Sequence, residues 1–295
     1  MTHIASSLRR FSVYFGAIVV IISAAFVPQA FAADPASQIH LSKNWSGYEM
    51  VGSSYTSVSG SWTVASSTPT NSKMSAEATW VGIGGANTSD LIQAGTQTIF
   101  VKGKPQYLAW YEILPDNQHA LPITVAPGDM VSVSLTETSP GMWQLVFVNN
   151  TTGKIYQTHI PYVSSHSSAE WVIERPLAVT NAGTGYLPLN NFGTVAFKNA
   201  SAQSNGVNIA VTADTAEQLV MSSTGIVAES LPTKAYGGVF SIMYLSPSLG
   251  RSYLRDLINT TTRVTTPAQH HEIPVQNLDL SSGTLIVNLS FASRH

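Results

Sequence analysis

Short segments in which apolar or β-branched residues alternate with polar ones recur along much of the chain. Each has the length and the two-residue period of a β-strand with one side against a core. Turn sequences separate them, such as A-P-G-D at 126–129 and N-N-T-T-G at 149–153. The segments are 55–64, 78–83, 91–101, 107–113, 130–137, 143–149, 155–160, 169–174, 193–198 and 237–245. We therefore predict an all-β fold, a two-sheet antiparallel β-sandwich of the jelly-roll or concanavalin kind.

One short helix is predicted after the last of these strands. Ser246 is a suitable N-cap, and Pro247 suits the first turn. The apolar residues spaced for one helix face are Leu249, Tyr253, Leu254, Leu257 and Ile258. A last strand is expected at 284–291. We predict that residues 33–246 form the sandwich and residues 247–295 an appendix of short helix, loop and final strand.

The N-terminal residues have the layout of a secretory signal peptide. Arg9 and Arg10 precede an apolar run from 11 to 26, and a small-residue site ends at Ala32. A membrane anchor is the alternative for such a run, but the helix-breaking Pro28 and the small-residue site favour removal. We predict cleavage after Ala32, a secreted product and no stable membrane association afterwards.

Charge and cysteine content narrow the function classes. The chain has 14 basic and 16 acidic residues, and only 10% of its residues are charged. Because no basic cluster or stripe occurs, a nucleic-acid partner is not expected. A low charge density reduces self-repulsion when carboxylates are neutralised, which suits an acidic environment. The chain has 0 cysteines, so its stability must come from its core rather than from disulfides.

Two polar residues interrupt otherwise apolar strand patterns. Gln93 lies within L-I-Q-A-G, and Glu170 within A-E-W-V-I-E. A polar side chain in such a strand costs stability unless it is hydrogen-bonded, so each is a candidate for function. From the residues alone, Gln93 could equally be paired with backbone and Glu170 could face solvent. Because Glu170 and Glu174 share a strand face, Glu174 is a rival for any role given to Glu170.

Several short motifs together resemble one family. They are N-W-S-G-Y at 44–48, W-V-G-I-G at 80–84, L-I-Q-A-G at 91–95, A-W-Y-E at 109–112, A-E-W-V-I-E at 169–174, N-F-G-T-V at 191–195 and G-G-V-F at 237–240. Their order and spacing resemble the glutamic peptidases, family G1, also called eqolisins, and the absence of cysteines is similar to a bacterial-type member. The resemblance runs from about residue 40 to 245. It implies a sandwich of two long sheets and acid endopeptidase activity on protein or peptide substrates.

The resemblance assigns a catalytic dyad to Gln93 and Glu170. The carboxylate of Glu170 would take a proton from the attacking water and return it to the leaving nitrogen, and the amide of Gln93 would stabilise the oxyanion. Activity should persist to low pH and fall as Glu170 protonates, unless its surroundings shift its pKa. No cofactor and no metal is implied, and pepstatin should not inhibit.

Further residues match supporting positions of the family. Glu112 would hydrogen-bond within the site; its alternative is a cross-hairpin partner for Lys102 or Lys104. Trp45 and Trp80 would line the cleft, although tryptophans in β-proteins are more often core residues. Trp110 and Trp171 belong either to the core or to the cleft wall.

Gly84 and Leu108 stand where fungal members carry acidic residues, which puts the pH profile in doubt. No long propeptide separates the predicted signal from Trp45. The enzyme is therefore expected either to need no processing or to be inhibited by its C-terminal appendix.

Other functions remain open at this stage. The same sandwich serves lectins, in which the tryptophans would be sugar platforms, and a glycosidase could use Glu112 with Glu170. His270, His271 and Glu272 could contact a metal, but neighbouring residues of an extended chain point opposite ways, which favours a solvated loop. A monomer is expected.

Overall fold

The computed structural model describes residues 39–180, 183–225, 227–260, 264–265, 274–276 and 288–289, all within one compact unit, Pro35–His295. The predicted signal peptide, the H-H-E sequence at 270–272 and most of the predicted last strand lie outside the described residues. In the part of the chain that is described, no helix is long and apolar enough to cross a membrane.

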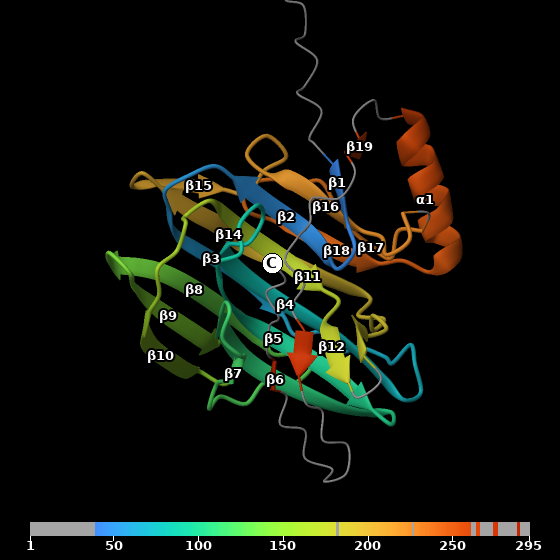
Figure 1. Cartoon of the computed structure of the whole chain (residues 1–295), viewed down its shortest axis with the longest axis horizontal. Coiled ribbons are helices and arrows are strands. Elements are labelled where there is room, and N and C mark those ends of the chain that lie inside the picture. Colours follow the sequence, from blue (N-terminus) through green and yellow to red (C-terminus); the bar gives the residue numbers. More distant parts are fainter. Residues whose placement is uncertain are drawn as a thin grey trace, which may run out of the picture. The chain divides into compact units, whose positions relative to one another are not determined.

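Two mainly antiparallel sheets, A and B, joined through strand β14, form the main body of the protein (Figure 1), which confirms the predicted all-β sandwich. Sheet A contains, in spatial order, β19 (Val264–Thr265), β1 (Ile39–Ser42), β16 (Glu217–Met221), β2 (Trp45–Val51), β11 (Ser168–Glu174), β4 (Met74–Gly84), β5 (Leu91–Val101), β6 (Lys104–Ile113) and β7 (His119–Ala120). Sheet B contains β10 (Lys154–Pro161), β9 (Met142–Asn149), β8 (Met130–Ser139), β3 (Tyr55–Thr63), β14 (Thr194–Ser204) and β15 (Val207–Ala210).

Strand β14 belongs to both sheets. Its first part pairs with β18 (Phe240–Tyr244), which continues through β17 (Ser230–Pro232) to β16 of sheet A. Its second part pairs with β3 of sheet B, after a register shift between Lys198 and Ser201. The shift marks a bulge that bends the strand, so one edge of the sandwich is closed by backbone hydrogen bonds.

A small separate sheet follows β11 along the chain. Strand β12 (Leu177–Thr180) pairs antiparallel with β13 (Gly183–Tyr186) and parallel with β20 (Pro274–Gln276), which in turn pairs with β21 (Asn288–Leu289). Each of the predicted strand segments up to residue 245 overlaps an observed strand. Strands β1, β2, β7, β12, β13, β15, β16 and β17 were not predicted, because seven of them have at most five residues and Gly47 interrupts the apolar pattern of β2.

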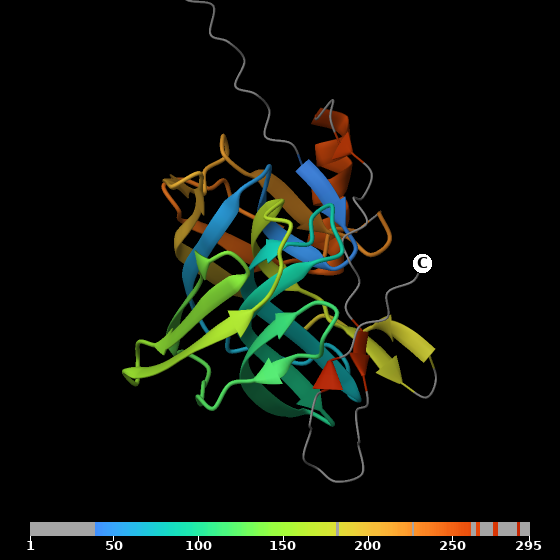
Figure 2. The same ribbon diagram turned by 60° about the vertical axis from the view of Figure 1, so that its left-hand side comes forward.

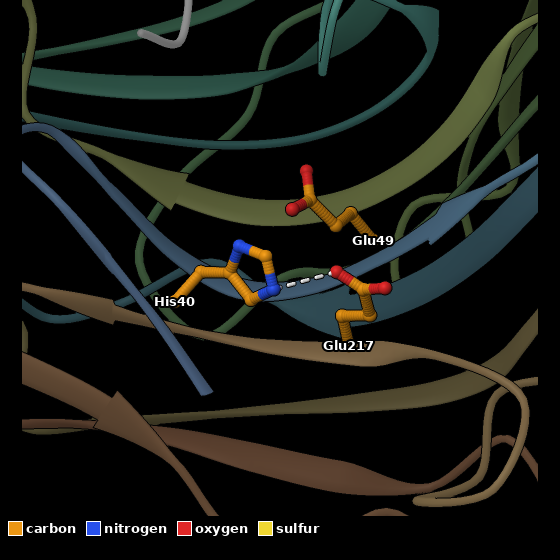
Figure 3. Close-up of side chains that lie close together, drawn as sticks. All are labelled: His40, Glu49 and Glu217. Atoms are coloured by element: carbon orange, nitrogen blue, oxygen red, sulfur yellow. Dashed lines mark ion pairs between the residues drawn. The ribbon is translucent and has the colours of Figure 1, made fainter. Parts of the chain in front are cut away.

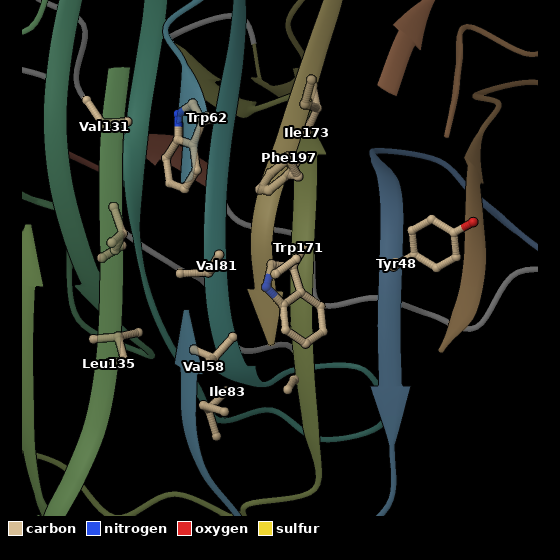
Figure 4. Packing of buried hydrophobic residues seen from close by; sticks show 14 of the residues in the cluster. Tyr48, Val58, Trp62, Val81, Ile83, Val131, Leu135, Trp171, Ile173 and Phe197 are labelled. Atoms are coloured by element: carbon tan, nitrogen blue, oxygen red, sulfur yellow. The ribbon is translucent and has the colours of Figure 1, made fainter. Parts of the chain in front are cut away.

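The main core fills the space between the two sheets (Figure 4). Trp171 and Val81 of sheet A share this core with Trp62 and Val58 of sheet B and with Phe197 of β14, and all five side chains are at most 2% exposed. The indole nitrogen of Trp171 donates a 2.7 Å hydrogen bond to the carbonyl of Ser59. Trp171 is therefore a core residue, which decides the alternative left open by the sequence.

Helix α1 (Pro247–Thr260) packs beside the β1 edge of sheet A (Figure 1 and Figure 2). Leu254 and Leu257 are buried against Leu41 and Val220. Gly250 permits this approach, because a Cβ there would lie 1.9 Å from the carbonyl oxygen of Ala228. The helix begins at Pro247 as predicted, but the inclusion of Leu249 in its apolar face was wrong, since that side chain is 62% exposed.

Candidate active site

The strands of sheet A that bury one face in the core carry a different set of side chains on the opposite face, here called the site face. Along β11, Ala169, Trp171 and Ile173 belong to the core between the sheets. By the two-residue period, Ser168, Glu170, Val172 and Glu174 point to the site face. All seven residues of β11 are buried, so this strand is covered on both sides.

A row of directly opposite residues crosses the site face. In spatial order the row contains Glu217 (β16), Glu49 (β2), Glu170 (β11), Gly82 (β4), Gln93 (β5) and Glu112 (β6). Directly opposite residues on neighbouring strands point to the same face. The register therefore brings the two predicted catalytic residues, Gln93 and Glu170, onto one line although they are far apart in the sequence.

Gly82 separates Gln93 from Glu170 in this row. It pairs with Gln93 on one side and with Glu170 on the other. A Cβ at this position would lie 2.9 Å from Cζ3 of Trp80 and 3.0 Å from Cδ1 of Leu91. The glycine thus keeps a side chain out of the line between the amide and the carboxylate.

Gln93 and Glu112 form a buried hydrogen-bonded pair. Nε2 of Gln93 donates a 2.8 Å hydrogen bond to Oε2 of Glu112, and the two residues are 0% and 1% exposed. Among the described residues, nothing donates to Oε1 of either side chain. Glu112 is not paired with Lys102 or Lys104, both of which are exposed. The pair therefore holds the Gln93 amide in place and leaves its oxygen available.

The two glutamates of β11 differ in their hydrogen bonds. Glu174 accepts a 2.9 Å bond from the indole nitrogen of Trp80 and a 3.3 Å bond from Nδ2 of Asn44. Glu170 is 0% exposed, yet no group in the described part of the chain makes a well-aligned hydrogen bond to either of its carboxylate oxygens. Glu174 is thus tied into the fold, whereas the carboxylate of Glu170 is open to a ligand.

Burial dominates the electrostatics of all three carboxyls. It raises the pKa of Glu170 well above 4.5; the hydroxyl of Ser168 opposes the rise, and the charges of Glu49 and Asp90 add to it. Burial also raises the pKa of Glu112 well above 4.5, with a further contribution from Glu174. For Glu174 burial raises the pKa to about 7 despite hydrogen bonds from Trp80, Trp45 and Asn44. Transferring a carboxylate from water into such a site disfavours its charged form.

Tryptophans and leucines surround the row on the same face. Trp45 and Trp80 contact each other edge to face, with ring centroids 5.0 Å apart, and both are 0% exposed. They share an apolar cluster with Trp110, Leu91, Leu114, Val172, Leu219 and Ala78, and Leu108 packs against it. Buried indoles cannot serve as flat sugar platforms. They enclose the polar row in an apolar setting that strengthens its electrostatic interactions.

The two departures from the family pattern have structural explanations. Gly84 has a φ of +89°, and a Cβ there would lie 2.6 Å from the carbonyl oxygen and 3.0 Å from Oδ2 of Asp90. Asp90 therefore brings a carboxylate close to the position where fungal members carry an acidic side chain. Leu108 instead extends the apolar cluster.

Sequence reasoning missed the part of the row that continues beyond Glu170. Glu49 is 2% exposed, and Glu217 pairs with it on the next strand. Glu217 also forms an ion pair with His40 of β1 at 2.8 Å. Once β2 is known to be a strand, the period of two from Trp45 places Glu49 on the same face as that tryptophan. No residue spacing could have revealed that its partner on β16 is Glu217.

Comparisons with known proteins agree on one family. Residues 43–235 match the Peptidase A4 family. Aspergillopepsin-2 of Aspergillus niger is 29% identical over 192 residues, 57% of this chain and 67% of that protein. Scytalidopepsin B of Scytalidium lignicola is 27% identical over 200 residues, 65% of this chain and 75% of that protein. The crystal structure of scytalido-glutamic peptidase with a transition state analog inhibitor superposes with a TM-score of 0.59 at 26% identity, covering 69% of this chain and 98% of that one.

Proposed function

Because this chain belongs to the Peptidase A4 family and is therefore a glutamic peptidase, we propose that Glu170 and Gln93 are its catalytic dyad. Glu170 acts as general base towards the attacking water and then as general acid towards the leaving nitrogen. Gln93 stabilises the tetrahedral oxyanion through the amide N–H that is not donated to Glu112. The related scytalido-glutamic peptidase binds a transition state analog, which supports the same chemistry here.

The observation that carries this proposal is the arrangement around Gly82. Gln93 and Glu170 flank a glycine in one row, and their available oxygens face the same side of sheet A. A buried polar atom without a partner costs about 1–3 kcal/mol, so such atoms are retained where a ligand satisfies them. Water held between an amide and a carboxylate, beside the carbonyl of a peptide, would satisfy both.

The rival residue, Glu174, is less suited to this role. Its oxygens already accept hydrogen bonds from Trp80 and Asn44. A base must be free to approach the water and to exchange a proton with it. We assign Glu174 to positioning Trp80 and Asn44, and Glu112 to orienting the amide of Gln93 through their 2.8 Å hydrogen bond.

The test is cleavage of denatured casein from pH 2 to 7 by the purified full chain and folded variants. We expect Glu170→Gln and Gln93→Ala to lose about 10²–10⁴-fold in kcat. Glu174→Gln should lose less than Glu170→Gln. Because burial raises the pKa of Glu170, activity should fall on the acid side at a pH above 4.5. Equal or greater loss in Glu174→Gln would transfer the role of base to Glu174.

Two finer properties belong to the same proposal. Pepstatin, added in excess over the enzyme, should leave cleavage unchanged, because a Gln/Glu dyad offers no aspartate pair. Export follows from the sequence of residues 1–32, and the N-terminal residue of the protein recovered from the medium should be Ala33.

A further inference from the structure

Glu49 lies between two other carboxylates on the site face. It is directly opposite Glu170 on β11 and directly opposite Glu217 on β16. Figure 3 shows it beside the 2.8 Å ion pair of Glu217 with His40. The exposed fraction increases outward, from 0% for Glu170 and 2% for Glu49 to 32% for the side chain of Glu217. The row thus runs from the buried site to the protein surface.

Three adjacent acidic residues in direct register are an unusual arrangement in a buried sheet. Cβ atoms of directly opposite residues are only about 4.5–5.5 Å apart, and like charges there repel. In addition to burial, the charge of Glu49, directly opposite on the neighbouring strand, therefore opposes the ionisation of Glu170 and raises its pKa.

The charged and titratable groups around the pair define the network. Glu49 faces Glu170 on β11 and Glu217 on β16. One side-chain nitrogen of His40 and one carboxylate oxygen each of Glu49 and Glu217 all lie within 4.8 Å of one another. Besides Glu49, the charge of Asp90 acts on Glu170, and the charge of Glu170 acts on Tyr55. On the β4 side the neighbour is Gly82, which carries no charge. Glu49 is therefore the carboxylate that faces Glu170 from the next strand.

We propose that Glu49 is a positioning residue for catalysis, which sets the protonation state of the base Glu170 across the β2–β11 strand pair. The proposal rests on the role given to Glu170 above. The negative charge of Glu49 keeps a proton on Glu170 at pH values where an isolated glutamate would have lost it. The enzyme consequently reaches its active, ionised form at a higher pH than it would without Glu49.

The experiment is the pH dependence of kcat/KM for the full-length enzyme and for Glu49→Gln, which keeps the shape and removes the charge. The acid limb of the profile should move to lower pH by about one unit, so activity on that limb rises about tenfold. The plateau should change less. Glu217→Gln, one strand further away, should produce a smaller shift.

Glu137→Gln is the matched control, because Glu137 lies on β8 of sheet B, outside the row, and forms a 2.8 Å pair with His166. Its acid limb should coincide with that of the wild type. An unmoved limb in folded Glu49→Gln would overturn the proposal. If Glu49→Gln does not fold, Glu49→Val provides the same comparison in a side chain that suits the apolar face.

A second measurement separates this proposal from the assignment of the base. Carbon-13 NMR of glutamate-labelled protein follows the Glu170 carboxyl directly, whether or not the protein cleaves casein. A lower titration midpoint of Glu170 in Glu49→Gln supports the coupling even if catalysis proves to use another residue. If the acid limb of the wild-type profile moves when EDTA or Zn²⁺ is added, the proposal is overturned. A metal ion would then hold the side chains of His40, Glu49 and Glu217 together.

Discussion

The two faces of sheet A are built on the same strands but follow different rules. The core face is apolar and packs against sheet B, where the indole of Trp171 donates a hydrogen bond to the carbonyl of Ser59 across the sandwich. The site face is equally buried, yet it carries Glu49, Glu170, Gln93 and Glu112 in one line. Burial therefore does not distinguish the two faces; hydrogen-bond satisfaction does.

This difference separates stability from function within single strands. On the core face, buried polar groups such as the indole nitrogens of Trp171 and Trp62 have partners at 2.7 and 2.9 Å. On the site face several carboxylate and amide oxygens have none from the described residues. Local rules of folding are broken mainly where a protein does chemistry, and the site face follows that pattern.

The largest effect should come from a matched pair on β11. Trp171→Ala removes a large core side chain and its hydrogen bond to Ser59, and should lower the free energy of unfolding by about 3–5 kcal/mol. Glu170→Leu, on the opposite face, should leave it unchanged or raise it at pH 7, since it replaces a buried carboxylate. Urea unfolding measures both, and a large loss in Glu170→Leu would contradict the comparison.

A second contrast concerns pH. Burial raises the pKa of both Glu174 and Glu77 to about 7 against an ordinary 4.5, although hydrogen bonds from Trp80 to Glu174 and from Ser67 to Glu77 oppose the rise. A carboxyl that binds its proton more tightly when folded stabilises the fold fully below pH 4.5, and this contribution is lost as the pH rises through 7. Each group should account for about 3 kcal/mol.

Thermal unfolding at pH 4 and pH 8 measures that difference. The melting temperature should be higher at pH 4, and Glu77→Gln and Glu174→Gln should each reduce the difference. Glu137→Gln, at a partly exposed ion pair, serves as the control and should not reduce it. A melting temperature that rises with pH would contradict the burial argument.

The smallest effect should follow from a single methyl group at Gly82. Gly82→Ala places a Cβ between Gln93 and Glu170 and against the ring of Trp80. A displacement of about 1 Å at a reacting centre can cost about 10²-fold, so we expect kcat/KM to fall by about 10–100-fold. Because the added Cβ would lie 2.9 Å from Cζ3 of Trp80, the free energy of unfolding should also fall, by about 1–3 kcal/mol. Val81→Ala, which shortens the neighbouring side chain on the core face, should lower the free energy of unfolding with little change in kcat/KM; urea unfolding and steady-state kinetics measure the two effects.

The sequence predicted the strands of the sandwich and the helix because these features are local. Alternation and turn residues placed every predicted strand up to residue 245, and the caps placed helix α1. The role of β2 was missed, since Gly47 hides its period, and with it the position of Glu49. Which strands become neighbours depends on long-range pairing, so no local pattern could place Glu217 beside Glu49 or Gly82 between the dyad.

The charged state of the site was also beyond the sequence. From the sequence, activity was expected to fall as Glu170 protonates, unless its surroundings shift its pKa. In the structure, burial and the facing carboxylate of Glu49 raise that pKa. These influences are properties of the assembled sheet, because they depend on which side chains face Glu170 and on how much water reaches it.

Helix α1 shows that the boundary of a family and the boundary of a fold need not coincide. The family match ends at residue 235, whereas Leu254 and Leu257 of the helix cover Leu41, Val220 and Leu231 of the sandwich edge. Without the helix, the side chains of Leu41, Val220 and Leu231 would lose this cover, and contiguous exposed apolar side chains are the kind of surface that drives proteins to associate. Residues outside the family match thus help to keep this edge of the sandwich out of water.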